Sequence, residues 1–217
     1  LVLLGLIRGL LLLPYTWRVP LCGWIMARLI APVAGYSRRI RDNLALIFPD
    51  MPEPEVRRMM RAVPDNVGRT IIEMYSGEAF LERARQAPIR GPGLAALEDA
   101  RAQNRPVVLV TGHFGSYDAS RAALKARGFK IGGLYRPMAN RYFNEHYVHA
   151  MGSIGGPLFA RGRRGMAGMV RFLREGGMLG IVQDQHMNMG AELTFFGHPA
   201  KTALSASELA LKYDALL

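Results

Sequence analysis

Five consecutive apolar or β-branched residues, Val107 to Thr111, constrain the fold more than any other stretch of the chain. Such a run is typical of a short strand buried on both faces, as in a parallel sheet. Residues 112–115 contain two glycines and favour a sharp turn, and residues 118–127 are helix-forming and stop at Gly128. A buried strand therefore passes directly into a helix, which is where ligands bind in open α/β sheets.

His113 and Asp118 lie at this transition, with four residues between them. A neutral imidazole takes a proton near neutral pH, and a carboxylate can fix its tautomer and stabilise the imidazolium. Because the stretch lacks a Gly-x-Ser-x-Gly motif, Ser116 is a poor hydrolase nucleophile, and direct acyl transfer onto a hydroxyl held over His113 is the simplest reaction. The alternative is that His113 caps a loop and Asp118 only caps a helix.

Strand and helix patterns alternate with short connections from residue 94 onward. Strands are predicted over 107–111, 130–135 and 178–183; helices are predicted over 94–103, 118–127, 141–152 and 166–175, with a loop over 155–165. This alternation predicts an α/β fold whose largely parallel central sheet is flanked by helices.

Parallel strands end at one edge of a sheet, so further polar residues should gather beside His113. Arg136 follows the second strand, and Gln183 and Asp184 follow the third. A guanidinium fork at Arg136 suits a phosphate or a developing oxyanion; the alternative is a surface ion pair. Asp184 is predicted to orient Arg136 or an acceptor hydroxyl, unless it is simply a loop carboxylate.

Metal and disulfide chemistry find little support. His146 and His149 lie three residues apart and His186 is close to Asp184, but no further ligand at suitable spacing joins them. The one cysteine, Cys22, excludes an intrachain disulfide and a Cys-rich zinc site. We expect no metal and no bound cofactor.

Residues 1–36 hold two short apolar runs separated by Tyr15, Trp17 and Arg18. Aromatic and arginine residues between such runs are typical of a segment anchored at a membrane interface, so we predict an N-terminal membrane-anchoring helical segment over 1–36 and a second domain over 37–217. The alternative is a buried core helix. The chain lacks an initial methionine and ends on an apolar stretch, and we expect the domain to be C-terminally incomplete.

The chain has 28 Lys and Arg against 17 Asp and Glu, a formal charge of +11. Such a balance suits an anionic partner: nucleic acid, an anionic membrane surface or an acidic substrate. The basic residues are mostly arginines beside apolar runs, without aromatic stacking blocks, which disfavours nucleic acid. A non-catalytic basic membrane-binding module remains an alternative to an enzyme.

Four ordered blocks resemble the late lipid A acyltransferases, the lauroyl and myristoyl transferases of Gram-negative bacteria. The blocks are Gly112-His-Phe-Gly-Ser-Tyr-Asp118, Leu134-Tyr-Arg-Pro137, Val182-Gln-Asp-Gln185 and Phe195-Phe-Gly-His-Pro-Ala-Lys-Thr202. Upstream, Arg41-Asp-Asn-Leu-Ala-Leu-Ile-Phe-Pro49 is similar to the stretch that follows the membrane anchor of that family, within the lysophospholipid acyltransferase superfamily.

The resemblance implies transfer of an acyl chain from an acyl carrier protein thioester, or from acyl-CoA, to a glycolipid hydroxyl at the cytoplasmic face of the inner membrane. It implies that His113 is the general base and Asp118 its carboxylate partner in the HX4D motif. It assigns the acceptor phosphate or oxyanion to Arg136 and an acidic site residue to Asp184, and it gives the 195–202 block a part in shaping the acyl site. Backbone N–H groups around Phe114 and Gly115 are the other candidate oxyanion donors, and Gln183 is a further substrate-binding candidate.

Two departures bear on the acceptor. Members acting on lipid A often carry Glu where this chain has Asp118, whereas mycobacterial phosphatidylinositol mannoside acyltransferases have Asp there. The family also continues well beyond residue 217. A lipid A precursor is the expected acceptor, and another glycolipid or lysophosphatidic acid is the alternative.

Overall fold

The computed structural model describes residues 2–217, and their contacts divide the chain into two compact units. The first, here called the helical unit, contains the residues up to Ala79 together with Phe114–Ser116; the second, the sheet unit, contains Phe80–His113 and Tyr117–Leu217. The boundary expected after residue 36 separates a predicted membrane-anchoring segment from a second domain, and it stays a prediction.

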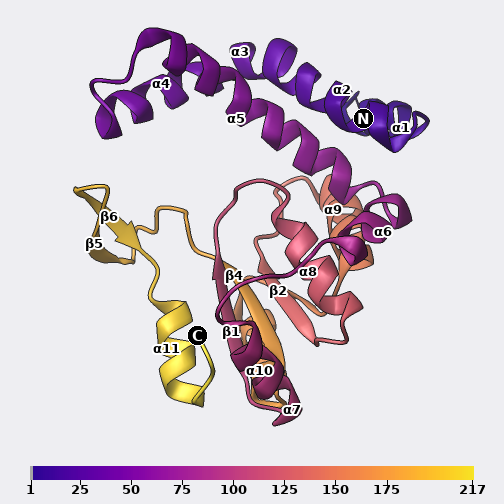
Figure 1. Cartoon of the computed structure of the whole chain (residues 1–217), viewed down its shortest axis with the longest axis vertical. Helices are drawn as coiled ribbons and strands as arrows, with labels where there is room; N and C mark the ends of the chain where they lie inside the picture. The colour runs from indigo at the N-terminus through magenta and orange to yellow at the C-terminus, as the bar shows by residue number, and fades with distance from the viewer. Residues whose placement is uncertain (1) are drawn as a thin grey trace. The chain divides into compact units, whose positions relative to one another are not determined.

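The helical unit begins with a chain of short helices. These are α1 (Val2–Leu11), α2 (Tyr15–Ile25), the π-helix η1 (Met26–Ile30), α3 (Ala31–Val33) and α4 (Tyr36–Ile47). The long helix α5 (Glu53–Met74) then packs against α2, η1 and α4 (Figure 1). Helix α5 continues without interruption through the buried Pro64. Packing along α2 outweighs the roughly 3 kcal/mol that an internal proline costs.

Glycines let α2 and α5 approach closely. A Cβ at Gly68 would lie 2.6 Å from the carbonyl oxygen of Cys22 and 2.7 Å from the Cβ of Met26, and a Cβ at Gly23 would lie 2.6 Å from Asp65 Oδ1. The buried thiol of Cys22 lies at this crossing, and burial raises its pKa to about 11. The crossing therefore depends on the absence of a side chain on both helices.

Substitution of Gly68 by alanine should destabilise the helical unit by about 1–3 kcal/mol, because a backbone carbonyl cannot move aside as a flexible side chain would. Chemical unfolding followed by tryptophan fluorescence measures this directly, since Trp17 and Trp24 are the only tryptophans. Gly9→Ala is the matched control, because its Cβ would meet nothing within 4 Å. Equal unfolding free energies for the two variants would contradict the close helix crossing.

Apolar side chains on this unit remain exposed. Leu12, Trp17, Leu29 and Val33 are 88, 67, 55 and 86% exposed. Across residues 2–217 no helix by itself has the length and hydropathy to cross a membrane; only Tyr15–Val33 and Tyr36–Ile47 taken together do, and they are bent by 86°. The membrane-anchoring role of residues 1–36 stays a prediction.

The sheet unit contains a four-stranded parallel sheet in the order β1-β4-β2-β3 (Figure 1). Its strands are β1 (Val107–Thr111), β2 (Ile131–Tyr135), β3 (Leu158–Ala160) and β4 (Met178–Val182). Its helices are α6 (Glu78–Gln86), α7 (Leu94–Ala102), α8 (Tyr117–Ala126), α9 (Arg141–Ile154), α10 (Arg163–Arg174) and α11 (Ser205–Tyr213). The predicted α/β class and the parallel sheet are confirmed.

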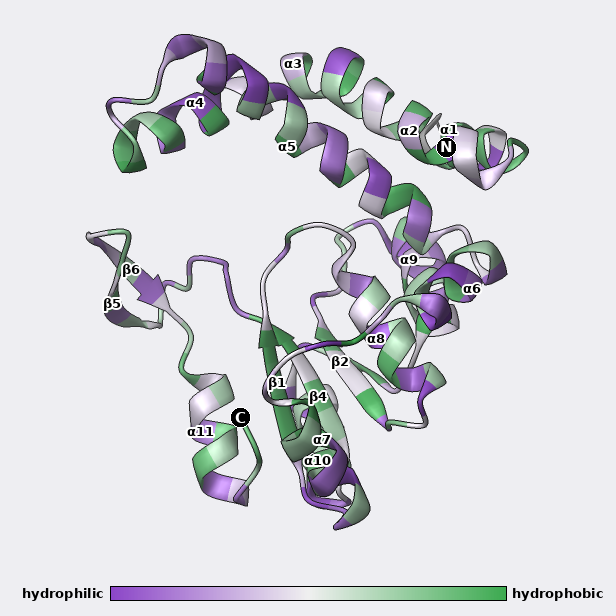
Figure 2. Cartoon of the chain, viewed as in Figure 1, coloured by the Kyte–Doolittle hydropathy of each residue, from purple (hydrophilic) through white to green (hydrophobic). Residues whose placement is uncertain are grey.

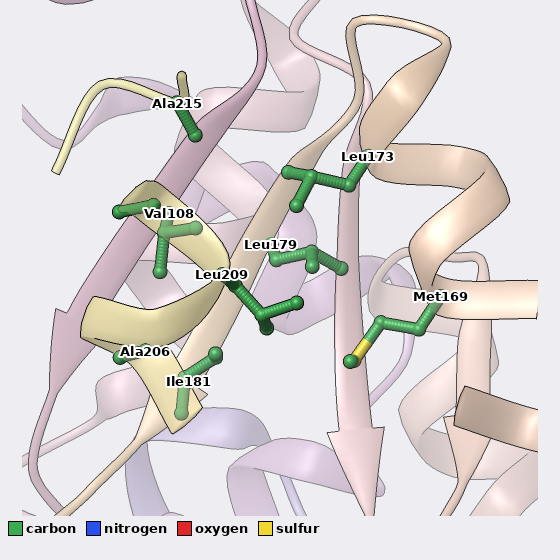
Figure 3. Close-up of a cluster of buried hydrophobic side chains, with 9 residues drawn as sticks. Val108, Met169, Leu173, Leu179, Ile181, Ala206, Leu209 and Ala215 are labelled. Carbon is green, nitrogen blue, oxygen red and sulfur yellow. The ribbon is translucent and has the colours of Figure 1, made fainter. Parts of the chain in front are cut away.

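Helices pack against both faces of the sheet, as the apolar run over 107–111 predicts, although Val110 in β1 stays 51% exposed. Val108, Leu179 and Ile181 point to one face, where α10 and α11 supply Met169, Leu173, Ala206 and Leu209 (Figure 3). Val107, Ile131 and Met178 point to the other face, where they pack with Leu97, Ala100, Leu124 and Phe129. Apolar colouring accordingly covers most of β1, whereas α5 alternates between apolar and polar (Figure 2).

Two parts of the observed structure, strand β3 and a β-hairpin, were not predicted from the sequence. The segment predicted as a loop over 155–165 contains β3, which pairs with β2 from Gly133↔Leu158 to Tyr135↔Ala160. Three residues among glycines give no strand pattern, so only the partner strand defines it. The 195–202 block forms most of an antiparallel hairpin of β5 (Ala191–Phe195) and β6 (His198–Thr202), with Phe195 and Phe196 exposed. Its role in shaping an acyl site stays a prediction.

Candidate active site

The register of two neighbouring strands brings His113 and Asp184 together. β1 and β4 pair in parallel up to Thr111↔Val182, and the amide of Gln183 donates to the carbonyl of Thr111 at 3.0 Å. His113 and Asp184 each follow two residues after the last paired position. The two side chains therefore emerge side by side at the carboxyl edge of the sheet, where ligands of open α/β sheets bind.

Two hydrogen bonds connect these residues. The backbone N–H of His113 donates to Asp184 Oδ2 at 2.6 Å, and Nδ1 of the His113 ring lies 2.7 Å from Asp184 Oδ1. The carboxylate thus holds both the backbone and the ring of the histidine. Both side chains remain about 40% exposed, so the ring is held in place yet accessible.

The protonation of the pair follows from its geometry. Partial burial raises the pKa of the Asp184 carboxyl, but the hydrogen bonds from the amide and ring of His113 outweigh burial and hold that pKa below its usual value. An ionised carboxylate only accepts hydrogen bonds, so in the neutral form of the ring Nδ1 carries the proton and Nε2 has the lone pair. No described residue hydrogen-bonds Nε2, which is therefore available to take a proton from a bound hydroxyl.

In the part of the chain that the structure describes, no hydrogen bond or ion pair joins His113 to Asp118, and the catalytic role expected of Asp118 stays a prediction. Asp118 lies in the first turn of α8, 7% exposed, and its Oδ1 accepts a hydrogen bond from Nη2 of Arg121 at 2.8 Å. Arg121 also donates to the carbonyl oxygens of Gly155 and Met151, at 3.0 and 3.2 Å. The i, i+3 spacing puts the two charges on one helix face, and this buried pair ties α8 to the end of α9. Asp118 is thus held by an arginine, and the acid beside His113 is Asp184.

Two tyrosines border this cluster. The ring of Tyr117 meets the His113 ring edge-on, with centroids 5.3 Å apart. Burial, with the negative charge of Asp118 in addition, raises the pKa of both Tyr117 and Tyr147. Both phenols therefore stay protonated, and Tyr117 limits how far the imidazole can rotate.

The other residues predicted to bind substrate lie in different surroundings. Arg136 follows β2 on the other side of β4; it is exposed and makes no hydrogen bond or ion pair with any described residue. Gln183 instead donates from Nε2 to the carbonyl of Ala203 at 2.6 Å, tying β4 to the chain after the hairpin. Phe114 is 74% exposed, and Gly115 has a φ of +58°, a conformation that favours glycine. The substrate-binding roles of these four residues stay predictions.

Arg121 is the residue that the sequence reasoning missed. A signal was present, because Asp118 and Arg121 stand three residues apart in the predicted helix over 118–127. Its burial was not visible, since it arises from the packing of α8 and α9. Among the other histidines, Nε2 of His186 lies 3.1 Å from Oδ1 of Asn188, and His146 and His149 are exposed on α9.

A histidine–carboxylate pair at the carboxyl edge of a parallel α/β sheet is typical of an enzyme active site. Comparison with known families identifies the family to which this site belongs. Residues 1–217 match the family described as bacterial lipid A biosynthesis acyltransferase. The chain belongs to that family.

Two curated proteins that resemble the chain at low sequence identity carry names that match this family. A lipid A biosynthesis acyltransferase 2 from Shigella flexneri is 27% identical over 187 residues, which are 80% of this chain and 55% of the relative. A lipid A biosynthesis lauroyltransferase from Escherichia coli K12 is 25% identical over 150 residues, 68% of this chain and 47% of the relative. The chain thus spans about half the length of the curated relatives it matches.

Proposed function

We propose that this chain forms the catalytic part of an acyltransferase that moves a fatty acyl chain from an acyl carrier protein thioester to a hydroxyl of a lipid A precursor. Membership of the family supports the acceptor, and acyl-CoA is the alternative donor. The observation that carries the proposal is the His113 ring, held by Asp184 at Nδ1 with Nε2 unoccupied.

The mechanism uses His113 as general base. Nε2 removes the proton of the acceptor hydroxyl as its oxygen attacks the thioester carbonyl, and Asp184 stabilises the imidazolium that forms. When the tetrahedral intermediate collapses, the C–S bond breaks and the imidazolium returns its proton to the leaving thiolate. The products are an ester and a free thiol.

A donor must stabilise the oxyanion of that intermediate. Arg136 is an exposed guanidinium at the same sheet edge with no ion-pair partner among the residues described, and the backbone N–H groups of Phe114 and Gly115 are the alternative. Loss of one such donor typically costs about 10²–10³ in rate. We assign Arg136 to the oxyanion or to the phosphate of the acceptor, both of which match its bidentate fork.

The cytoplasmic face of the inner membrane is the proposed location. Exposed apolar side chains at Leu12, Trp17 and Val33 support contact with a lipid surface. The formal charge of +11 supports attraction to anionic lipids and to an acidic carrier protein.

An assay of the purified enzyme tests the proposal. Lauroyl and myristoyl thioesters of acyl carrier protein and of CoA are offered with a lipid A precursor, lysophosphatidic acid or a phosphatidylinositol mannoside, and the products are identified by mass spectrometry. We expect transfer from the carrier protein to the lipid A precursor, and a loss of about 10²–10⁴ in kcat for His113→Ala.

His149→Ala is the control, because it removes an exposed histidine of α9. Thermal unfolding of both variants shows whether the fold is intact. Full turnover by a folded His113→Ala protein would rule out the general base, and preference for another acceptor would overturn the assignment to lipid A.

A further inference from the structure

The helical unit contains a cavity of about 540 Å³ whose lining includes four arginines. It lies between α5 and the segment formed by the end of α2 and η1, next to the close crossing at Gly23 and Gly68. The side chains that matter here are Trp24, Arg28, Arg57, Arg58, Arg61 and Asp65. Four guanidinium groups thus line a space large enough for a small-molecule headgroup.

The positive charge of this cavity is poorly compensated from within the chain. Arg57 pairs with Glu53 at 3.2 Å and Arg58 pairs with Glu55 at 2.6 Å, and both carboxylates are half-exposed. Arg28 and Arg61 make no hydrogen bond or ion pair with any described residue, and both are exposed. Exposed pairs are weak, so an entering dianion can compete for all four groups.

Asp65, the acidic residue in the lining, does not remove the excess of positive charge in the cavity. Asp65 forms an ion pair with Arg69, one helical turn further along α5. Its charge is therefore compensated by an arginine outside the lining. The cavity keeps an excess of positive charge and suits a group with more than one negative charge.

A phosphate monoester fits these groups best. Guanidinium forks bind phosphate oxygens bidentately, and a monoester carries about −1.5 to −2 charges near neutral pH, more than the single charge of a diester. Arg28 lies in the π-helical turn η1, a local geometry that occurs often at functional sites.

The surroundings of the cavity point to a lipid rather than a free ion. Trp17, Leu21, Trp24 and Arg28 follow one another at spacings of four, three and four residues, so they share one helix face. Trp17, Leu21 and Trp24 are 67, 38 and 48% exposed. Tryptophans concentrate at the headgroup level of membranes, which puts a cavity beside Trp24 at the depth of lipid phosphates.

We propose that this cavity binds the phosphate monoester headgroup of a membrane lipid, whose acyl chains lie along the exposed apolar face of α2. Arg28 and Arg61 hold the phosphate, and Arg57 and Arg58 add charge. The site belongs to the helical unit and does not depend on acyl transfer at His113.

Vesicle binding by the whole protein tests the proposal without any catalytic step. Phosphatidylcholine vesicles carry either phosphatidic acid, a monoester, or phosphatidylglycerol, a diester, at matched surface charge. The double variant Arg28→Gln/Arg61→Gln should lose at least about tenfold more affinity for the monoester vesicles than for the diester vesicles, because charge-assisted bonds to the phosphate are lost.

The control Arg38→Gln/Arg39→Gln removes two exposed charges from α4, outside the cavity, and should weaken binding to both vesicle types equally. The variant Arg28→Lys/Arg61→Lys keeps both positive charges but lacks the bidentate guanidinium groups. It should also lose the preference for monoester vesicles, and that result would show that the loss in the glutamine variant does not come from misfolding. An equal loss for both vesicle types in the cavity variant would overturn the proposal. So would calorimetry in which inorganic phosphate, but not phosphatidic acid, binds in an arginine-dependent way.

Discussion

Replacement of Asp184 by asparagine is expected to lower kcat by about 10²–10⁴ while the protein stays folded. An asparagine can still accept the backbone N–H of His113 through its oxygen, but it then presents an NH₂ group to Nδ1. The ring proton must move to Nε2, which leaves the imidazole in a tautomer that cannot take a proton from the acceptor. The charge that stabilises the imidazolium is lost as well.

Steady-state kinetics with the preferred donor and acceptor measure this effect, and circular dichroism with thermal unfolding shows whether the fold is retained. Asp214→Asn is the matched control, because Asp214 is 95% exposed and pairs with Arg105 at 3.1 Å, outside the site. If Asp184→Asn keeps the kcat of the unmodified enzyme, Asp184 does not position the base.

Asp118→Asn is expected to act on stability, with a loss of about 3–5 kcal/mol in the free energy of unfolding. The side chains of Asp118 and Arg121 are only 10 and 11% exposed. The substitution leaves the buried guanidinium without a compensating charge, since the asparagine oxygen and the carbonyl oxygens of Gly155 and Met151 are neutral acceptors. Because those carbonyl oxygens still accept hydrogen bonds from Arg121, we expect a loss of unfolding free energy at the lower end of this range. Chemical denaturation measures it.

The double variant Asp118→Asn/Arg121→Met separates stability from catalysis. It removes the unpaired charge together with its partner, so most of the lost unfolding free energy should return. Activity measured below the unfolding transition should then be close to that of the unmodified enzyme. A fully folded Asp118→Asn protein with unchanged stability and no turnover would instead make Asp118 the partner of His113, as the sequence motif alone suggests.

The pH dependence of the His113–Asp184 contact has a definite sign. Because the folded-state pKa of Asp184 is depressed, its contribution to stability is present above the pKa of an ordinary carboxyl, about 3.9, and is lost as the pH falls through the folded value. The carboxylate therefore stays ionised throughout the neutral range in which a histidine base operates.

Much of the sheet unit could be predicted because its signals are local. The apolar run over 107–111 and the glycine stop at Gly128 mark a strand and a helix within a few residues, and both are present. β3 has no such signal, since it is a strand only through its pairing with β2. The continuous helix through Pro64 likewise depends on packing against α2, which a local pattern does not contain.

The sequence by itself determined the alternation of strands and helices, the strand ends that carry His113, Arg136 and Asp184, and membership of the family, because each is encoded in short contiguous motifs. Only the tertiary structure decided which acid faces the histidine. Asp118 is close in sequence, but helix geometry aims it at Arg121; Asp184 is 71 residues away, and the register of β1 against β4 brings it to hydrogen-bonding distance. Strand pairing is a long-range interaction, and a motif spacing does not contain it.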